Sequence, residues 1–117
     1  MKKEYAYSGG FDLEFNEYTT LYPEIWNIIE FPFEYKLKKN EAATIVLRSR
    51  YIFNDEYDME LVPSIIDYGW TKKIRAKVKY IPKTMRIVPL RFVKGQSICQ
   101  LVIFKIPKIK GSNKERK

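Results

Sequence analysis

Prolines and turn-forming residues interrupt this chain so often that no long helix fits between them. Pro23 and Pro32 stand inside the aromatic and β-branched segment 18–34, and a proline removes a backbone donor and clashes with the preceding helical turn. At most one helical turn fits there, over residues 24–29. Turns rich in Gly, Pro and Asn separate short apolar runs about every eight to twelve residues. The pattern predicts an all-β barrel or sandwich with almost no helix.

Two segments give the clearest strand patterns. Over residues 74–80 the even positions are apolar or aromatic and the odd positions are Arg or Lys, which predicts a half-exposed strand with a basic outer face. The nearly continuous apolar run 98–106 predicts a buried, central strand, in which the polar Gln100 must find a partner. Further strands are expected at 11–13, 43–47 and 85–88, and a strand with an acidic loop at 51–62.

Composition limits the domain organisation and the chemistry. A chain of 117 residues that is 45% hydrophobic fits one domain, residues 1–107, followed by a basic, disordered tail, residues 108–117. The sequence shows neither a secretory signal nor an apolar run of the roughly 18 residues that a membrane span needs, so we expect no membrane partner. The only cysteine, Cys99, is expected to be a buried, reduced thiol in a cytoplasmic protein. The absence of histidine excludes Ser-His triads and most zinc sites.

The stretch Ser64 to Lys72, SIIDYGWTK, is the most informative local motif. It predicts a strand that ends in a tight turn, with Gly69 supplying a backbone angle that other residues resist. A carboxylate at such a turn, Asp67, three residues before Trp70, suits a site for a flat ligand. In the alternative, Asp67 forms an Asx-turn with its own backbone and Trp70 belongs to the core.

Charged residues suggest two further sites. The net charge of +8 suits partners that carry phosphate. Arg48-Ser49-Arg50 follows an apolar strand and reads either as a phosphate cradle, because guanidinium and hydroxyl groups donate to oxyanions, or as a surface turn. The four acids of segment 51–62 read either as a metal site or as a solvated loop.

Four segments, in this order, resemble the motifs of the trimeric deoxyuridine triphosphatase (dUTPase) family, which includes dCTP deaminases. They are GGFDLEF, LRSRY, SIIDYGW and VKGQSICQLVIF, and together they cover roughly residues 8–106. Asp67 follows Ser49 by 18 positions, close to the separation in the family. The resemblance implies a distorted jelly roll, a β-clip barrel, that forms homotrimers with active sites between the subunits.

The third motif implies how the nucleoside part of a substrate would bind. By resemblance, Asp67 would be the catalytic base that orients a water for attack on a phosphate of a deoxynucleoside triphosphate. Trp70 would pack against the deoxyribose and disfavour a ribose 2′-hydroxyl. The flanking strands, including Ile66, would present the backbone that reads the edge of the pyrimidine.

The other motifs imply the phosphate side of the site. Arg48 and Ser49 would hold phosphate oxygens, with Gln100 nearby. Asp12 would contact the water shell of a Mg²⁺ ion that bridges the phosphates. Magnesium suits this chemistry because it retains its waters and binds phosphate oxygens.

The sequence also departs from the family pattern. Arg50 and Tyr51 replace a Gly-Leu pair, Lys72 replaces a closing glycine, and Gln96-Ser97 replaces Asp-Arg. The Gly-rich, Phe-bearing fifth motif has no counterpart in the tail GSNKERK. The deaminase branch has a catalytic Glu seven residues after its Trp, where this chain has Lys77, and a final Arg in its second motif, where this chain has Phe53.

These features leave several functions open. The first is a dUTP pyrophosphatase with Mg²⁺ as cofactor and a deoxyuridine nucleotide as substrate. The alternative is an inactive dUTPase-like scaffold that binds a nucleotide or a protein partner, in a regulatory or viral accessory role. Deamination of dCTP ranks below both, and nucleic-acid binding ranks last because no recognised motif supports it. The small, Lys-rich chain fits a viral or mobile-element source, and hence the cytoplasm of a host cell.

Overall fold

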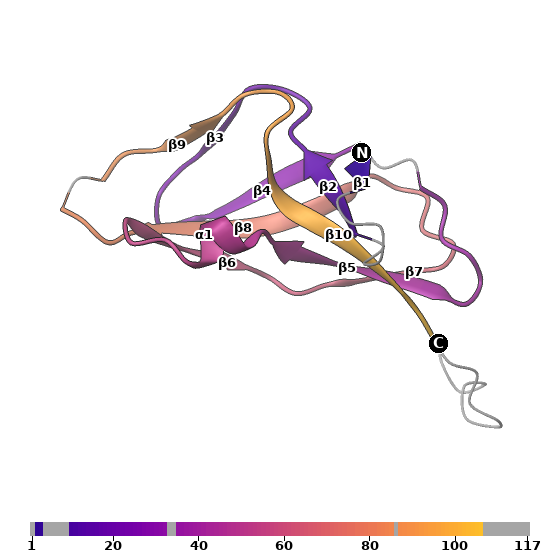
Figure 1. Cartoon of the computed structure of the whole chain (residues 1–117). Helices are drawn as coiled ribbons and strands as arrows, with labels where there is room; N and C mark the ends of the chain where they lie inside the picture. The colour runs from indigo at the N-terminus through magenta and orange to yellow at the C-terminus, as the bar shows by residue number, and fades with distance from the viewer. Residues whose placement is uncertain (1, 4–9, 33–34, 86, 107–117) are drawn as a thin grey trace.

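A computed structural model describes residues 2–3, 10–32, 35–85 and 87–106, and in them it contains ten strands and one short helix (Figure 1). In chain order the elements are β1 (Lys2–Lys3), β2 (Gly10–Glu14), β3 (Thr19–Leu21), β4 (Trp26–Phe31), β5 (Glu41–Leu47), α1 (Ser49–Ile52), β6 (Tyr57–Leu61), β7 (Ile65–Asp67), β8 (Ile74–Pro82), β9 (Leu90–Phe92) and β10 (Ser97–Lys105). The described part of the chain is therefore all-β with almost no helix, as the spacing of the turns predicts.

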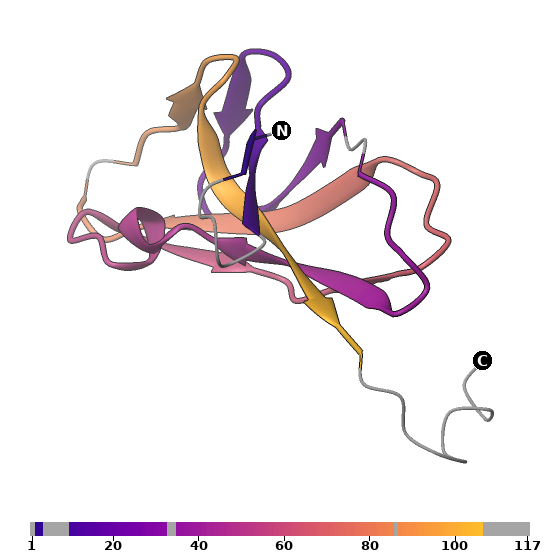
Figure 2. The ribbon, with the colours of Figure 1, turned by 45° about the vertical axis from the view of Figure 1, so that its right-hand side comes forward.

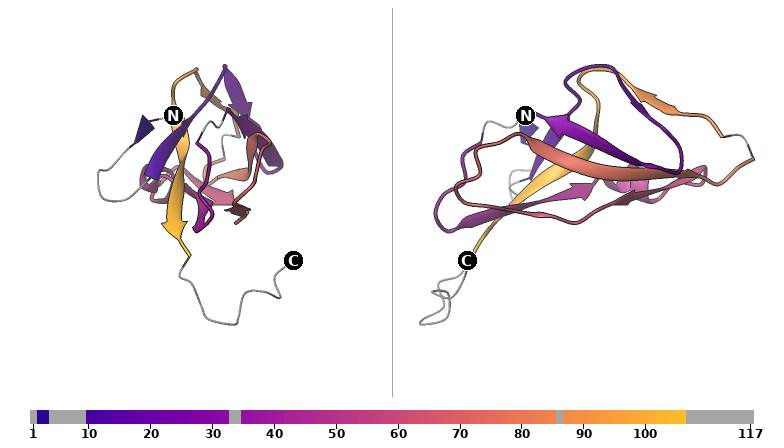
Figure 3. Two further views of the ribbon diagram at one scale, coloured as in Figure 1. Left: turned by 90° about the vertical axis from the view of Figure 1, so that its right-hand side faces the viewer. Right: turned by 180° about the vertical axis from the view of Figure 1, so that it is seen from behind.

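The strands form three antiparallel sheets. The largest has the order β1-β2-β10-β5-β7, the second has the order β4-β8-β6, and β3 pairs with β9 alone. In Figure 2 the strand β10 crosses in front of the long strand β8, so that the two larger sheets face each other. The end-on view in Figure 3 shows the strands surrounding one central region, which the core side chains fill.

The core combines aliphatic side chains from the large sheets with a group of aromatic rings. Leu101 on β10 and Val78 on β8 are both fully buried. The Phe15 ring stacks on Phe92 with a centroid separation of 5.0 Å and also packs against Phe31. These ring contacts hold the β3–β9 pair against the rest of the molecule, since Phe92 lies on β9.

Two sequence predictions about long strands are confirmed. In β8 the residues of the apolar positions 74, 76, 78 and 80 are buried, and those of the basic positions face outward. The strand β10 lies between β2 and β5, and its first half is buried, although Phe104 near its end is exposed. The alternation therefore predicted burial along β8, whereas the apolar run predicted it only for the first half of β10.

Two local predictions were wrong, and a third was right only in part. The segment 24–29 does not form a helical turn, because Glu24 has a positive φ of 63° and the following residues pair with β8 as strand β4. No strand covers 85–88 in the described part of that segment; the strand there is β9, which starts after Pro89. The strand expected within 51–62 is present as β6, but the segment begins with a helical turn, α1, which carries the Tyr51 ring into the core.

Two further expectations concern the ends and the membrane. The proposed basic tail, residues 108–117, lies outside the described residues. Among the described residues no helix has the length and apolar character needed to cross a membrane.

Candidate functional site

The turn that follows β7 has the geometry expected from its sequence. Asp67 ends the strand, and the Trp70 N–H donates to the Asp67 carbonyl at 3.2 Å, which closes a four-residue turn. Gly69 has a φ of 95°, a region that favours glycine. None of the hydrogen bonds among the described residues involves the Asp67 side chain, so the turn is held by its backbone and not by an Asx contact.

A cleft of about 580 Å³ lies beside this turn. Ile65, Ile66 and Trp70 line one side of it, and the beginning of β8, from Ile74 to Lys77, lines the other. The volume falls within the range of about 300–1,000 Å³ that is usual for small-molecule sites. The cleft therefore lies between the two chain segments that flank the turn.

The sequence-predicted residues around the cleft occupy different positions. Ile66 is buried and lines the cleft. Trp70 also lines it and is 49% exposed, so it does not belong to the core as the alternative interpretation required. Asp67 is exposed and precedes the turn, but it is not among the residues that line the cleft.

The cleft has a basic mouth that the motif analysis did not anticipate. Lys72, Lys73 and Arg75 line it together with Lys77, and Glu30 is the acidic residue among the lining side chains. The alternating pattern of residues 74–80 had placed the basic positions outward. The pattern gave no indication that β7 would lie beside these basic residues, because the place of β7 is set by its pairing with β5.

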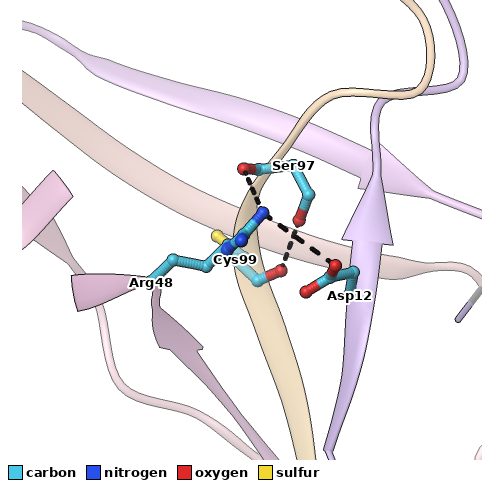
Figure 4. A network of polar contacts seen from close by, with 4 residues as sticks. All are labelled: Asp12, Arg48, Ser97 and Cys99. Carbon is cyan, nitrogen blue, oxygen red and sulfur yellow. Dashed lines mark hydrogen bonds and ion pairs between the residues drawn. The ribbon is translucent and has the colours of Figure 1, made fainter. Parts of the chain in front are cut away.

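A second group of predicted residues meets at a polar cluster (Figure 4). The Arg48 guanidinium lies 3.9 Å from the Asp12 carboxylate and donates to the Ser97 carbonyl at 3.4 Å. The Ser97 hydroxyl donates to the Cys99 carbonyl at 2.8 Å. Three segments that are far apart in the sequence thus converge, since Asp12 lies on β2, Arg48 follows β5 and Ser97 begins β10.

Asp12 is the notable member of this cluster. The residue is buried, and its Oδ1 atom has no hydrogen-bond partner among the described residues. A buried acceptor without a partner is costly. This oxygen therefore has capacity for a further donor, such as a bound water. Asp12 does not lie on an exposed edge of the sheet, because β2 lies between β1 and β10.

Gln100 and Ser49 lie close to the same cluster. Gln100 is half-buried and stands opposite Asp12 on β2 and Val46 on β5. Ser49 is exposed at the start of α1, directly after Arg48. The polar residue in the apolar run thus lies in the same row of the sheet as the buried carboxylate.

Cys99 is unsuited to nucleophilic chemistry. Its side chain is fully buried in the core, and burial raises the pKa of the thiol to about 12. The thiolate form is the nucleophile, so this cysteine acts as an apolar core residue.

The two groups of predicted residues lie at opposite ends of β5 within one chain. Asp67 pairs with Ala42 at the start of β5, whereas Arg48 follows its last residue. At about 3.3 Å per residue, the six steps from Ala42 to Arg48 separate these positions by roughly 20 Å. Figure 1 shows β7 beside one end of β5 and α1 beyond the other. One chain therefore does not bring Asp67 and Arg48 to the same ligand atom.

Among the described residues, no group of three or more acidic or cysteine side chains is arranged to hold a metal ion directly. The acidic segment after α1 therefore offers no metal cage in this part of the chain. Its Asp58 instead lies 3.4 Å from the Lys83 ammonium in an exposed ion pair.

The fold is that of the dUTPases. No family model matches the sequence, and no curated protein does, but solved dUTPase structures superimpose on nearly the whole chain. The dUTPase of phage phi11 of S. aureus, in a mutant form, matches with a TM-score of 0.71 and 15% identity over 99% of this chain and 90% of that one.

Two dUTPases from other sources match as well. The native EIAV dUTPase has a TM-score of 0.72 and 20% identity over 95% of this chain and 92% of that one. The dUTPase of Streptococcus mutans has a TM-score of 0.71 and 20% identity over 94% and 88%. The TM-scores establish a shared fold, and the resemblance seen in the four sequence motifs agrees with it.

Proposed function

We propose that this chain is a dUTPase-like pyrophosphatase that converts dUTP to dUMP and pyrophosphate. The observation that carries the proposal is the cleft beside the Asp67–Trp70 turn, in a chain that has the dUTPase fold. Among the solved neighbours, the dUTPase of Staphylococcus phage 80alpha was determined with the nucleotide analogue dUpNHpp. A nucleotide is therefore the first ligand to test.

The cleft would hold the nucleoside. Its apolar side, with Ile66 and Ile65, suits the flat face of a pyrimidine, and the backbone of the two flanking segments supplies donors and acceptors for its edge. Trp70 would lie against the deoxyribose, where its bulk disfavours a 2′-hydroxyl. Asp67, at the edge of the turn, would orient the water that attacks the phosphorus atom next to the sugar.

The polar cluster would hold the phosphates. Arg48 presents a planar fork of donors, which suits phosphate oxygens, and Ser49 and Gln100 supply neutral donors beside it. The reaction breaks the bond between the first and second phosphates, so these donors would stabilise the negative charge that develops on the departing pyrophosphate.

The residues present fit a magnesium ion that is held through water. The buried Asp12 Oδ1 has no protein partner among the described residues and would accept a hydrogen bond from a metal-bound water. A Mg²⁺ ion bound there would neutralise phosphate charge when the substrate is present. The described residues offer no direct cage of acidic side chains, which agrees with an ion bound mainly by phosphates and waters.

The proposed site requires more than one copy of the chain. The separation of roughly 20 Å between the two ends of β5 prevents one copy from supplying both Asp67 and Arg48 to one triphosphate. We therefore propose a homotrimer in which a neighbouring copy brings its Arg48 cluster to the cleft, so that each site combines residues of two subunits.

The alternative is an inactive scaffold that binds a nucleotide or a protein partner. Lys72 supports it, because this long cation lines the cleft at the position where the family has a closing glycine. Lys77 also lines the cleft and stands where the deaminase branch has its catalytic Glu. The chain is therefore not expected to deaminate dCTP. The alternative retains the trimer and nucleotide affinity but predicts no turnover.

The first experiment measures pyrophosphate release from dUTP, dCTP, dTTP and dATP with Mg²⁺, using the wild type and the Asp67→Asn variant. The proposal predicts release from dUTP that the substitution reduces by at least about a hundredfold. If a folded trimer binds dUTP without turnover, the scaffold alternative holds and the proposed activity is refuted.

A second experiment tests the shared site. Trimers of Asp67→Asn alone and of Arg48→Ala alone should both be inactive. After the two variants are unfolded together and refolded as mixed trimers, about one quarter of the sites would combine an intact Asp67 with an intact Arg48. No recovery from a mixture that has demonstrably exchanged subunits would refute the two-subunit site.

A further inference from the structure

The outer face of β8 carries a regular row of cations. Arg75, Lys77 and Lys79 alternate with buried residues and project to the same side of the sheet β4-β8-β6. Alternate residues of a strand are about 6.6 Å apart, so the three side chains leave the strand at regular intervals. A row of this kind matches an extended polymer of regularly spaced anions.

An exposed indole lies beside this row. Trp26 on β4 stands opposite Lys79 in the register, and the neighbouring Ile28 stands opposite Lys77. The Lys79 ammonium lies 4.7 Å from the centroid of the Trp26 ring, and that of Lys77 lies 6.0 Å from it. Trp26 is 38% exposed. Cation–π contacts at exposed positions are weak, so either ammonium group could leave the ring for a phosphate oxygen.

The row is only partly neutralised by acidic neighbours. Glu30 on β4 and Glu60 on β6 flank it, and Glu30 lies 4.0 Å from Lys73. Among the described residues, none of the three cations of the row forms an ion pair within 4.0 Å. Arg75 and Lys77 also line the cleft, whereas Lys79 and Trp26 lie beyond it. Because lysine is depleted in protein interfaces, the Lys79–Trp26 end of the row is expected to remain exposed when copies of the chain assemble.

We propose that the outer face of β8, together with Trp26, binds single-stranded nucleic acid. The phosphates would follow the cation row and one base would stack on the indole. A positively charged track beside an aromatic platform is the combination by which proteins bind single strands without reading their sequence. The sequence contains no recognised nucleic-acid motif, but this surface arises from strand register, which a motif does not encode. The inference does not depend on dUTP hydrolysis.

The test measures binding of a fluorescein-labelled oligothymidylate of about 12 nucleotides by fluorescence anisotropy. The full-length chain is titrated at several salt concentrations. The double variant Lys77→Gln/Lys79→Gln is compared with Lys36→Gln/Lys39→Gln, which removes the same charge from exposed positions on another part of the chain. The first double variant should make the slope of log K against log salt shallower by about 1.4, at about 0.7 per lost phosphate contact.

The indole gives an independent readout. The Trp26→Leu variant should bind the oligothymidylate about tenfold more weakly, as expected for the loss of one stacked base. Trp26 does not line the cleft, so the same variant should retain the dUTP affinity of the wild type. In a Trp70→Phe background, the remaining Trp26 fluorescence should be quenched on addition of the oligonucleotide.

Several outcomes would overturn the inference. They are equal losses in both double variants, unchanged binding by Trp26→Leu, and the absence of binding at low salt. Polyglutamate of matched charge serves as a competitor, and displacement of the oligothymidylate at equal charge concentration would show a general site for acidic chains instead. A failure of dUTP turnover in the wild type would leave these binding results unaffected, so the two proposals fail separately.

Discussion

Replacing Gly69 with alanine tests whether the turn geometry controls the cleft. Gly69 has a φ of 95°, and a Cβ atom added there meets no heavy atom within 4 Å. The cost is therefore conformational and not steric. An L-residue in the left-handed region costs roughly 1–2 kcal/mol, and the smaller conformational freedom of alanine in the unfolded chain returns about 0.4–1 kcal/mol. The free energy of unfolding should fall by about 1 kcal/mol, which lowers Tm by roughly 4 °C.

Gly95 provides a matched control. It has a φ of 94°, and its added Cβ also meets nothing within 4 Å, but its turn is closed by the Gln96 N–H donating to the Val93 carbonyl, away from the cleft. Both alanine variants should lose similar stability in thermal unfolding at equal protein concentration. Only Gly69→Ala should also weaken dUTP binding, measured by calorimetry, because it displaces Trp70. Equal nucleotide affinities in the two variants, with equal losses of Tm, would refute the link between turn and cleft.

Three further predictions concern stability. Leu101→Ala, in the fully buried centre of β10, should reduce the free energy of unfolding in urea by about 2–5 kcal/mol; a smaller loss would mean that the core collapses around the cavity. Burial raises the pKa of the Cys99 thiol to about 12. The stabilisation from burying the neutral thiol is therefore present below pH 9 and is lost as pH rises towards 12. The fall of Tm at alkaline pH should be shallower in Cys99→Ala. The Lys38 N–H and the Tyr35 hydroxyl both donate to the Glu41 carboxylate, and chiefly the Lys38 bond lowers its pKa. The stabilisation that the ionised Glu41 carboxylate contributes is present above the unfolded pKa of about 4.5 and is lost as pH falls through the lower pKa of the folded state. Glu41→Gln should therefore flatten the acid side of the plot of Tm against pH.

The sequence predicted those parts of the structure that depend on local pattern. The alternation in residues 74–80 indicates which side of β8 is buried, and the glycine after Asp67-Tyr68 indicates a turn that needs a positive φ. Each of these signals lies within a few residues and reflects a constraint that the backbone imposes directly. The four motifs together indicated the fold because they resemble those of the dUTPase family in order and in spacing.

The errors arose where tertiary contacts decide the outcome. The segment 24–29 is short and apolar, and its pairing with β8 makes it a strand whatever its local preference. The turn α1 forms because the Tyr51 ring enters the core beside Phe92 at a centroid distance of 6.1 Å. The residues around Tyr51 in the sequence do not indicate that Phe92 will lie beside it.

The candidate site shows the same division between local and distant information. The motifs identified Asp12, Arg48 and Asp67 separately, but only strand register shows that Arg48 meets Asp12 across the sheet while Asp67 lies at the other end of β5.

That separation decides what the site requires. A ligand held in the cleft reaches cations of the β8 row, since Arg75 and Lys77 line the cleft, but it does not reach Arg48 of the same chain across roughly 20 Å. Within one chain the cleft is therefore a basic nucleotide-sized pocket that lacks the Arg48 cluster. The proposed triphosphate hydrolysis would therefore depend on assembly, whereas the proposed binding along β8 would not, because every residue of that face belongs to one chain.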